Sequence, residues 1–357
     1  MKIQSNAFRL TEPGQFEQAT LIHDYDDRDI IVKPTKASVC HADLRYYTGN
    51  RRPEALAEKL PMALFHEGIG IVEDSKHPDF IQGDKVVIVP NIPSYLRKQS
   101  FAPSSYQDNY DEHALFMGSG FDGICQDKLV VPGDNVVKVP DTLDEDVALL
   151  AELCSVSLFP INQLEHITTD NSPQVAIFGD GPVGYLAATA LHYIYGIEQE
   201  QLLVFGAVEE KLAAFESFAT THLVFDYDFA QHRGVHTVFE CAGGKFSESA
   251  INQAIDLIDR QGHIVLMGVT EERVGINTRD VLEKGLTFSG SSRSTKREFE
   301  QLINAFSNKQ YQKALRQLIP DKYYHIYNTD DLKVALDDTA AHKGWKKTYL
   351  QYHWQNE

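Results

Sequence analysis

A strand, a glycine-rich turn and a helix follow one another between residues 174 and 193, and this succession constrains the fold most strongly. The apolar run Gln174-Val-Ala-Ile-Phe178 is typical of a buried strand, and it leads into Gly179-Asp-Gly-Pro-Val-Gly184. The alanine-rich segment 185–193 is typical of a helix. Such a turn lets the backbone approach a pyrophosphate, to which the start of the helix offers N–H groups. The segment therefore predicts a dinucleotide site, with a plain structural turn as the alternative. The expected cofactor-contacting residues of the turn are Gly179, Gly181, Pro182, Val183 and Gly184.

The sequence on either side of this turn predicts two domains in an α/β chain. Further strands are expected at 201–205, 237–240 and 263–267, and segments with a helical pattern separate them. This alternation indicates a doubly wound parallel sheet over residues 151–290. Residues 1–150 instead contain short β-rich runs at 29–33, 68–72 and 85–89, punctuated by Gly and Pro, which predicts a compact β-rich domain. A helix is expected at 144–152, where the pattern changes. The segment 291–357 is helix-rich, ends in a strand at 348–352, and is expected to complete the first domain.

Composition excludes several classes of function. The chain has 33 basic and 51 acidic residues and a formal charge of −18, which argues against nucleic acid or an anionic membrane as the main partner. Its four cysteines never occur as Cys-X-X-Cys, so neither a disulfide framework nor a zinc ribbon fits. No signal-peptide core or membrane-spanning apolar run is present. We expect a cytoplasmic protein with a small-molecule substrate.

The end of the second expected strand bears on the choice of cofactor. NAD-binding domains usually carry an acid there, about 20 residues after the glycine turn, to hold the ribose hydroxyls. This chain has Gly206 at that place, which leaves room for a 2′-phosphate, and Lys211 is the nearest obvious cation. These residues predict NADPH over NADH, although Glu209 and Glu210 do not help a phosphate and a tight turn without cofactor meaning is the alternative.

Five motifs, in order along the chain, carry a family resemblance. They are Cys40-His-Ala-Asp43, His66-Glu-Gly-Ile-Gly-Ile-Val72, Gly83-Asp-Lys-Val86, Glu152 and the turn from Gly179 to Gly184. Together they resemble the medium-chain dehydrogenase/reductase superfamily of zinc alcohol and polyol dehydrogenases. The resemblance implies a GroES-like β-rich catalytic domain (1–150, completed by 291–357) and a Rossmann cofactor domain (151–290).

The same resemblance, and not the spacing, selects the metal ligands. It implies that Cys40, His66 and Glu152 bind one catalytic zinc, a donor set that zinc accepts, and that Glu67 can fill the fourth position in the resting enzyme. It implies further that Asp43 orients the metal-bound histidine and that Lys347 reaches the cofactor phosphates.

Three departures from the family pattern qualify these expectations. Residues 91–124 contain no cysteine, so a second, structural zinc is not expected. Ala42 stands where alcohol dehydrogenases carry a hydroxyl of the proton relay, and Phe65 replaces the usual glycine before the His-Glu pair.

Within the superfamily, the chain most resembles the ribulose-5-phosphate reductases of teichoic acid synthesis. The residues that carry this likeness are Cys40-His-Ala-Asp-Leu-Arg-Tyr-Tyr47 and Ser119-Gly-Phe-Asp-Gly123. The likeness implies NADPH-linked reduction of D-ribulose 5-phosphate to D-ribitol 5-phosphate and association with the cytidylyltransferase that uses the product. The wider superfamily resemblance implies a homodimer. A sugar phosphate needs a cationic site, and Arg45, Arg51 and Arg52 follow the first zinc ligand closely; a solvated basic loop is the alternative.

Other functions remain open at this stage. A polyol or alcohol dehydrogenase acting on unphosphorylated sugars would use the same metal and cofactor. A zinc-free quinone or enone reductase would not need Cys40, His66 and Glu152 together. A non-enzymatic NADPH-binding protein would retain the fold without turnover.

Overall fold

A computed structural model describes residues 1–99, 101–102, 104–164, 167, 174–229, 234–270, 272–342 and 344–354. The chain forms two compact units, each described by itself below. Unit 1 comprises Met1–Glu152, Ser294–Ser307 and Leu318–Glu357, and unit 2 comprises Leu153–Arg293 and Asn308–Gln317. Among the helices of the described ranges, none has the length and apolar character needed to cross a bilayer.

A seven-stranded sheet forms the centre of unit 1. Six strands follow the order β10-β6-β5-β3-β18-β17, and β9 also pairs with β3. Their bounds are β3 (Asp29–Ser38), β5 (Glu67–Ser75), β6 (Lys85–Ile88), β9 (Leu129–Pro132), β10 (Val136–Lys138), β17 (Tyr324–Ile326) and β18 (Tyr349–Tyr352). The runs predicted at 29–33, 68–72 and 85–89 lie in β3, β5 and β6. The strand predicted near the C-terminus is β18, which pairs antiparallel with β3 and so joins residues far apart in sequence.

Smaller sheets and helices complete unit 1. A three-stranded sheet has the order β2-β1-β4, and β7 pairs with β8. The strand bounds are β1 (Lys2–Glu12), β2 (Gln15–Asp24), β4 (Met62–Ala63), β7 (Asn91–Ile92) and β8 (Leu115–Phe116). The helices are α1 (His41–Tyr47), α2 (Pro53–Lys59), α3 (Glu145–Ala148), α10 (Lys296–Ala305) and α12 (Thr329–Ala341). One apolar core joins the sheets to α1 and α12, with Val32, Tyr46, Ile88 and Leu336 among its buried residues.

Unit 2 contains the parallel sheet predicted from the alternating strands and helices. Its order is β13-β12-β11-β14-β15-β16, and every pairing is parallel. The bounds are β11 (Gln174–Phe178), β12 (Leu202–Gly206), β13 (Thr220–Leu223), β14 (Val235–Glu240), β15 (His263–Leu266) and β16 (Thr287–Gly290). Counted from β11, this is the 3-2-1-4-5-6 order of a doubly wound dinucleotide-binding fold.

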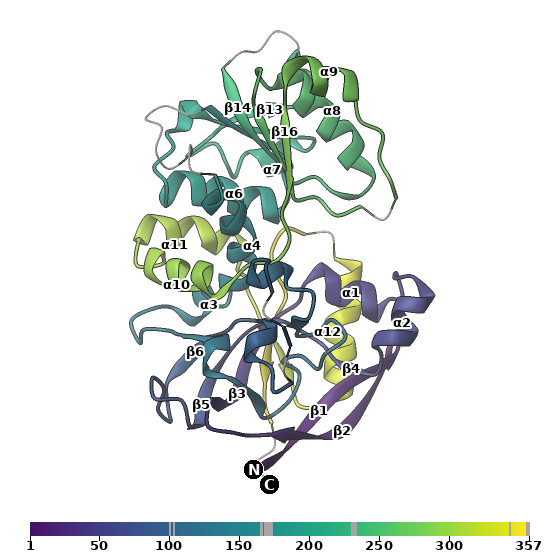
Figure 1. Ribbon diagram of the computed structural model, residues 1–357, viewed down its shortest axis with the longest axis vertical. Coiled ribbons are helices and arrows are strands. Elements are labelled where there is room, and N and C mark those ends of the chain that lie inside the picture. Colours follow the sequence, from purple (N-terminus) through teal and green to yellow (C-terminus); the bar gives the residue numbers. More distant parts are fainter. Residues whose placement is uncertain are drawn as a thin grey trace. The chain divides into compact units, whose positions relative to one another are not determined.

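Helices flank the sheet of unit 2. Figure 1 shows α6, in teal, and α8 and α9, in green, beside the strands. The bounds are α4 (Ala151–Asn162), α6 (Pro182–Tyr193), α7 (Glu209–Leu212), α8 (Ser247–Leu257), α9 (Thr278–Lys284) and α11 (Lys309–Leu315). The buried side of α8 packs Ile251 and Ile255 into a core with Phe178 and Phe205 of the sheet. The strand, turn and helix on which the prediction of a Rossmann-type fold rested are β11, residues 179–181 and α6.

The single helix expected over 144–152 is two helices in the structure. Helix α3 ends at Ala148, and α4 begins at Ala151. Between them the Leu150 N–H bonds the Val147 carbonyl at 3.1 Å, a tighter i→i−3 turn that interrupts the α-helical ladder. This break places Glu152 in the first turn of a new helix.

Candidate active site

Cys40 is fixed by the way helix α1 begins. It is the N-cap of α1, and Asp43, three residues later, accepts a hydrogen bond from the Cys40 backbone N–H at 2.9 Å. The pair forms a reciprocal capping box, which satisfies backbone donors at the helix start. Asp43 is fully buried, while Cys40 is half-buried. A Cys-X-X-Asp sequence therefore sets the position of the thiol through local backbone bonding.

His66 and Glu67 stand where β5 begins, directly after a backbone outlier. Phe65 has φ +72°, in the left-handed region that suits glycine, the residue expected there from the family pattern. Its amide donates to Asp43 Oδ1 at 3.3 Å, and its carbonyl accepts from the Ile124 N–H at 2.9 Å. These bonds hold the strained residue and aim the next two side chains at Cys40.

Three of the expected metal ligands meet in one cluster. The ligand atoms offered by Cys40, His66 and Glu67 all lie within 4.8 Å of one another. Glu152, the remaining predicted ligand, is 6% exposed and interacts electrostatically with His66 and Glu67, although it is not one of these three. Burial raises the pKa of Glu152 to about 7, an effect that the charge of His66 reduces and that of Glu67 strengthens.

Lys347 brings an ammonium group to this cluster. Its ammonium donates to the Val39 carbonyl at 2.8 Å and to Glu67 Oε1 at 3.0 Å, and lies 2.9 Å from Glu67 Oε2. The lysine side chain is 10% exposed and that of Glu67 is fully buried. Burial alone would raise the pKa of Glu67, but the charges of Lys347 and His66 outweigh it and lower the pKa. The lysine expected to reach the cofactor phosphates is thus engaged by Glu67 in this structure.

The charges of the cluster fit a divalent cation. Burial alone would lower the pKa of His66, but the charges of Asp43 and Cys40 raise it well above its usual range. His66 Nδ1 is buried without a hydrogen bond and lies 3.7 Å from Asp43 Oδ1. Three buried carboxylates and a thiol surround one lysine and one imidazole, so the site holds more potential negative than positive charge. Thiol, imidazole and carboxylate are the donors that zinc accepts, and the residues therefore fit that metal.

The three arginines proposed for phosphate binding have different surroundings. Arg51 lies over the Tyr46 ring, with Cζ 4.3 Å from the ring centroid. Arg45 donates from Nε to the Asn50 carbonyl at 3.4 Å. Arg52 is exposed and is the N-cap of α2. Burial lowers the pKa of His41, and the charges of Arg45 and Arg51 lower it further, so positive charge lies near the residue that follows Cys40, one of the expected metal ligands.

The glycine turn has the geometry of a dinucleotide site. Gly179 has φ +136°, and its N–H donates to the Phe205 carbonyl at 2.9 Å. A Cβ at Gly184 would lie 2.1 Å from the Gly179 carbonyl oxygen, so only glycine lets α6 approach β11 this closely. A Cβ at Gly181, the N-cap of α6, would meet no atom within 4 Å. The backbone of Gly181 is therefore open to a ligand, while Pro182 and Val183 begin the helix behind it.

An aspartate that sequence reasoning missed organises the end of β12. Asp180 Oδ2 accepts from the Ala207 and Val208 N–H groups at 2.8 and 2.9 Å. A Cβ at Gly206 would lie 2.7 Å from the Asp180 Cβ, so the space that glycine leaves is filled by this side chain. Lys211 Nζ lies 3.8 Å from Asp180 Oδ1. The only signal available in the sequence was an acid inside the glycine motif.

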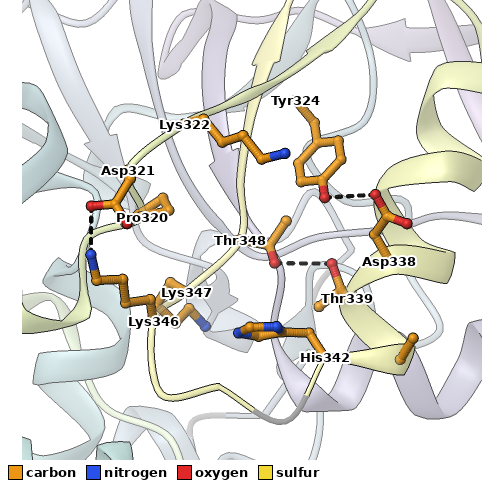
Figure 2. A pocket seen from close by; sticks show the side chains of 11 residues that line it. Pro320, Asp321, Lys322, Tyr324, Asp338, Thr339, His342, Lys346, Lys347 and Thr348 are labelled. Carbon is orange, nitrogen blue, oxygen red and sulfur yellow. Dashed lines mark hydrogen bonds and ion pairs between the residues drawn. The ribbon is translucent and has the colours of Figure 1, made fainter.

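A cavity of about 540 Å³ lies on the C-terminal segment of unit 1. Figure 2 shows Lys346 joined to Asp321 and Tyr324 joined to Asp338 across its walls, at 2.6 and 2.8 Å. Its lining residues are Pro320, Asp321, Lys322, Tyr324, Asp338, Thr339, Ala341, His342, Lys346, Lys347 and Thr348. Lys347 lines this cavity and also pairs with Glu67, so the cavity adjoins the cluster of Cys40, His66 and Glu67.

Comparison with known proteins agrees with this geometry. Residues 26–141 match the alcohol dehydrogenase GroES-like domain family, and residues 182–308 match the zinc-binding dehydrogenase family. Ribulose-5-phosphate reductase 1 of Staphylococcus aureus is 37% identical over 351 residues, covering 98% of this chain and 99% of the relative. The ribulose-5-phosphate reductase of Bacillus spizizenii is 34% identical, with the same coverage. The crystal structure of S. aureus TarJ in complex with NADPH superimposes with a TM-score of 0.82 at 32% identity, covering 98% of this chain and all of that one.

Proposed function

This chain belongs to the medium-chain dehydrogenase/reductase family of zinc-binding alcohol dehydrogenases, and on that premise we propose that it reduces the ketone of D-ribulose 5-phosphate to D-ribitol 5-phosphate with NADPH. The observation that carries the proposal is the buried cluster of Cys40, His66 and Glu67 in a chain that is 34–37% identical over nearly its whole length to ribulose-5-phosphate reductases. The product would serve the synthesis of CDP-ribitol and ribitol teichoic acid.

We propose that one zinc ion is held by Cys40, His66 and Glu152, with Glu67 filling the fourth position in the resting enzyme. When bound, the zinc supplies Lewis acidity toward the ketone oxygen and NADPH supplies the hydride. Asp43 orients His66 through the Nδ1 side of its ring, as carboxylates commonly do for ligating histidines. Lys347 balances the charge of Glu67. Ala42 offers no hydroxyl, so water is the proton source in this proposal.

The cofactor part of the proposal rests on unit 2. The open backbone at Gly181 and the start of α6 would receive the pyrophosphate of NADPH. Gly206 and Lys211 are the residues proposed for the 2′-phosphate, which requires the Asp180 side chain to leave the space that it fills beside Gly206. Lys347 remains a candidate for the cofactor phosphates. The domain assignment belongs to the same proposal, with the GroES-like part at 1–150 and 291–357 and the Rossmann part at 151–290. Arg45, Arg51 and Arg52 are the candidates for the substrate phosphate.

Two further expectations accompany this function. We propose that the protein is a cytoplasmic homodimer and that it associates with the cytidylyltransferase that uses its product. Size-exclusion chromatography with light scattering, alone and with that enzyme, tests both associations.

Deuterium transfer tests the reaction itself. Zinc-loaded protein is incubated with ribulose 5-phosphate and NADPH deuterated at C4, with each C4 stereoisomer in turn. One of the two isomers is expected to give ribitol 5-phosphate that is one mass unit heavier. Cys40→Ala should give no product while Cys125→Ala, at a cysteine buried in the core of the same unit, should remain active. No labelled product with either isomer would refute the proposal.

A further inference from the structure

Two cations and a hydroxyl gather around the ring of Tyr46. Besides Arg51, Lys59 lies over this ring, with Nζ 6.0 Å from the centroid. Lys59 also donates to Ser119 Oγ at 3.2 Å, and the Tyr46 hydroxyl lies 3.3 Å from the same Oγ. We call Tyr46, Arg51, Lys59 and Ser119 the Tyr46 cluster. Tyr46 is 1% exposed, and its ring offers a fixed surface for both cations.

Among the residues that the structure describes, no carboxylate pairs with the cations of the Tyr46 cluster. Within the part of the chain that the structure describes, neither Arg51 nor Lys59 has a carboxylate at ion-pair distance. Arg51 Nε is buried and has no hydrogen-bond partner there. The chain carries 51 acidic residues against 33 basic ones, so acids were available to pair with these groups. An unpaired buried donor is costly, and an anion would satisfy it.

Backbone geometry directs the Lys59 side chain toward Ser119. A Cβ at Gly120 would meet the Cγ of Lys59 at 3.4 Å, so the lysine stem lies along this glycine. Gly118 and Gly120 have φ +66° and +87°, which gives the turn that carries Ser119 its shape. The Lys59 ammonium is therefore guided to the Ser119 hydroxyl by a glycine turn.

The Tyr46 cluster borders the proposed metal ligands. Tyr46 lies on α1, the helix that begins at Cys40. The turn with Ser119 touches the other ligand segment, because a Cβ at Gly118 would lie 3.1 Å from the Phe65 nitrogen. Phe116, just before this turn, has its ring centroid 5.3 Å from that of His66. An anion bound by the cluster would lie on a molecule that extends toward Cys40 and His66.

We propose that Arg51 and Lys59, presented over the Tyr46 ring, bind the phosphate group of the substrate, with Ser119 as a hydroxyl donor. This inference rests on the proposed function and adds Lys59 and Ser119, which sequence analysis had not assigned to phosphate. Arg51 contributes a planar fork for two phosphate oxygens, and Lys59 contributes a compact charge. Among the three arginines, the geometry favours Arg51 over the exposed Arg52.

Calorimetric titration of ribulose 5-phosphate into the zinc-loaded protein without NADPH tests the inference separately from turnover. Lys59→Gln and Arg51→Gln should each weaken binding about tenfold to a hundredfold, as expected for a lost charge-assisted bond. Binding of unphosphorylated ribulose should not change, which also shows that the variants are folded. Lys333→Gln, at a half-buried lysine of α12 in the same unit, is the matched control and should bind like the wild type.

The outcomes separate this inference from the proposed function. If the wild type reduces ribulose 5-phosphate and both variants bind it as tightly as the wild type, the phosphate assignment is wrong and the function stands. If the wild type binds the compound through Arg51 and Lys59 but does not reduce it, the function is wrong and the phosphate site stands. If the wild type neither binds nor reduces it, both are wrong. An equal loss of ribulose and ribulose 5-phosphate binding in the variants would also overturn the assignment.

Discussion

Replacing Lys347 by methionine should strongly destabilise unit 1 in the absence of metal. The substitution keeps the length of the side chain but leaves the fully buried carboxylate of Glu67 without its cation. Removing one partner of a buried ion pair costs about 3–5 kcal/mol. Because 1 kcal/mol shifts the midpoint of a cooperative unit of about 150–250 residues by roughly 2–4 °C, the expected fall is roughly 6–20 °C.

Tryptophan fluorescence provides the assay. The chain has two tryptophans, Trp345 and Trp354, and both belong to unit 1, so their emission during heating reports the unfolding of that unit. Bound zinc should reduce the effect, because the metal supplies positive charge near the same carboxylate. Combining Lys347→Met with Glu67→Gln should restore much of the lost stability, because the uncompensated charge is then absent.

Lys346→Met is the matched control. Lys346 pairs with Asp321, whose side chain is 88% exposed, and a surface pair of this kind contributes about 0–1 kcal/mol. If metal-free Lys347→Met melted together with Lys346→Met, within about 2 °C of the wild type, the claim that Lys347 compensates a buried charge would be refuted.

Three further predictions concern the cofactor turn, acid stability and the metal. Gly184→Ala should lower NADPH affinity at least about tenfold in a fluorescence titration and destabilise unit 2 by about 1–3 kcal/mol. The reason is that the added Cβ would lie 2.1 Å from the Gly179 carbonyl oxygen. Unchanged affinity would contradict the packing argument. Burial alone would raise the pKa of Asp111, but hydrogen bonds from the Ser94 hydroxyl and from the Ser94 and His113 amides lower it. Its stabilisation is therefore present above the unfolded pKa of about 3.9 and is lost as pH falls through the lower folded value. Asp111→Asn should accordingly reduce the free energy of unfolding, measured in urea, at pH 7. Near pH 3 the free energies of the variant and the wild type should differ less. The same difference at both pH values would show that the charge is irrelevant. Chelation should abolish ketone reduction and added zinc should restore it, whereas full activity of protein shown by elemental analysis to be metal-free would exclude a zinc-dependent reaction.

The parts of the fold that depend on local patterns could be predicted from the sequence. The β11 strand, its glycine turn and α6 are contiguous, and the alternation that follows indicated the parallel sheet. The prediction of one unbroken helix over 144–152 was wrong, because the hydrogen bond from the Leu150 N–H to the Val147 carbonyl interrupts it. Hydrophobic periodicity does not report such a break.

The site was less accessible to sequence reasoning, because its members come from distant segments. Cys40 and His66 have no diagnostic spacing, so the choice of ligands depended on family resemblance. The position of Asp180 in the space beside Gly206 depends on packing between two loops. The approach of Lys59 to Ser119 likewise depends on a turn 60 residues away in sequence. Neither leaves a periodic signal in the sequence.

The most direct test of the central claim is the rate of NADPH oxidation by zinc-loaded protein with ribulose 5-phosphate. Parallel reactions contain NADH, unphosphorylated ribulose, or a chelator. The account predicts rapid oxidation that requires the metal, a lower rate with NADH, and a much higher kcat/KM for the phosphorylated ketose than for ribulose. Equal kcat/KM for the two ketoses would contradict recognition of the phosphate, and absence of oxidation with ribulose 5-phosphate despite bound zinc and NADPH would contradict the proposed function.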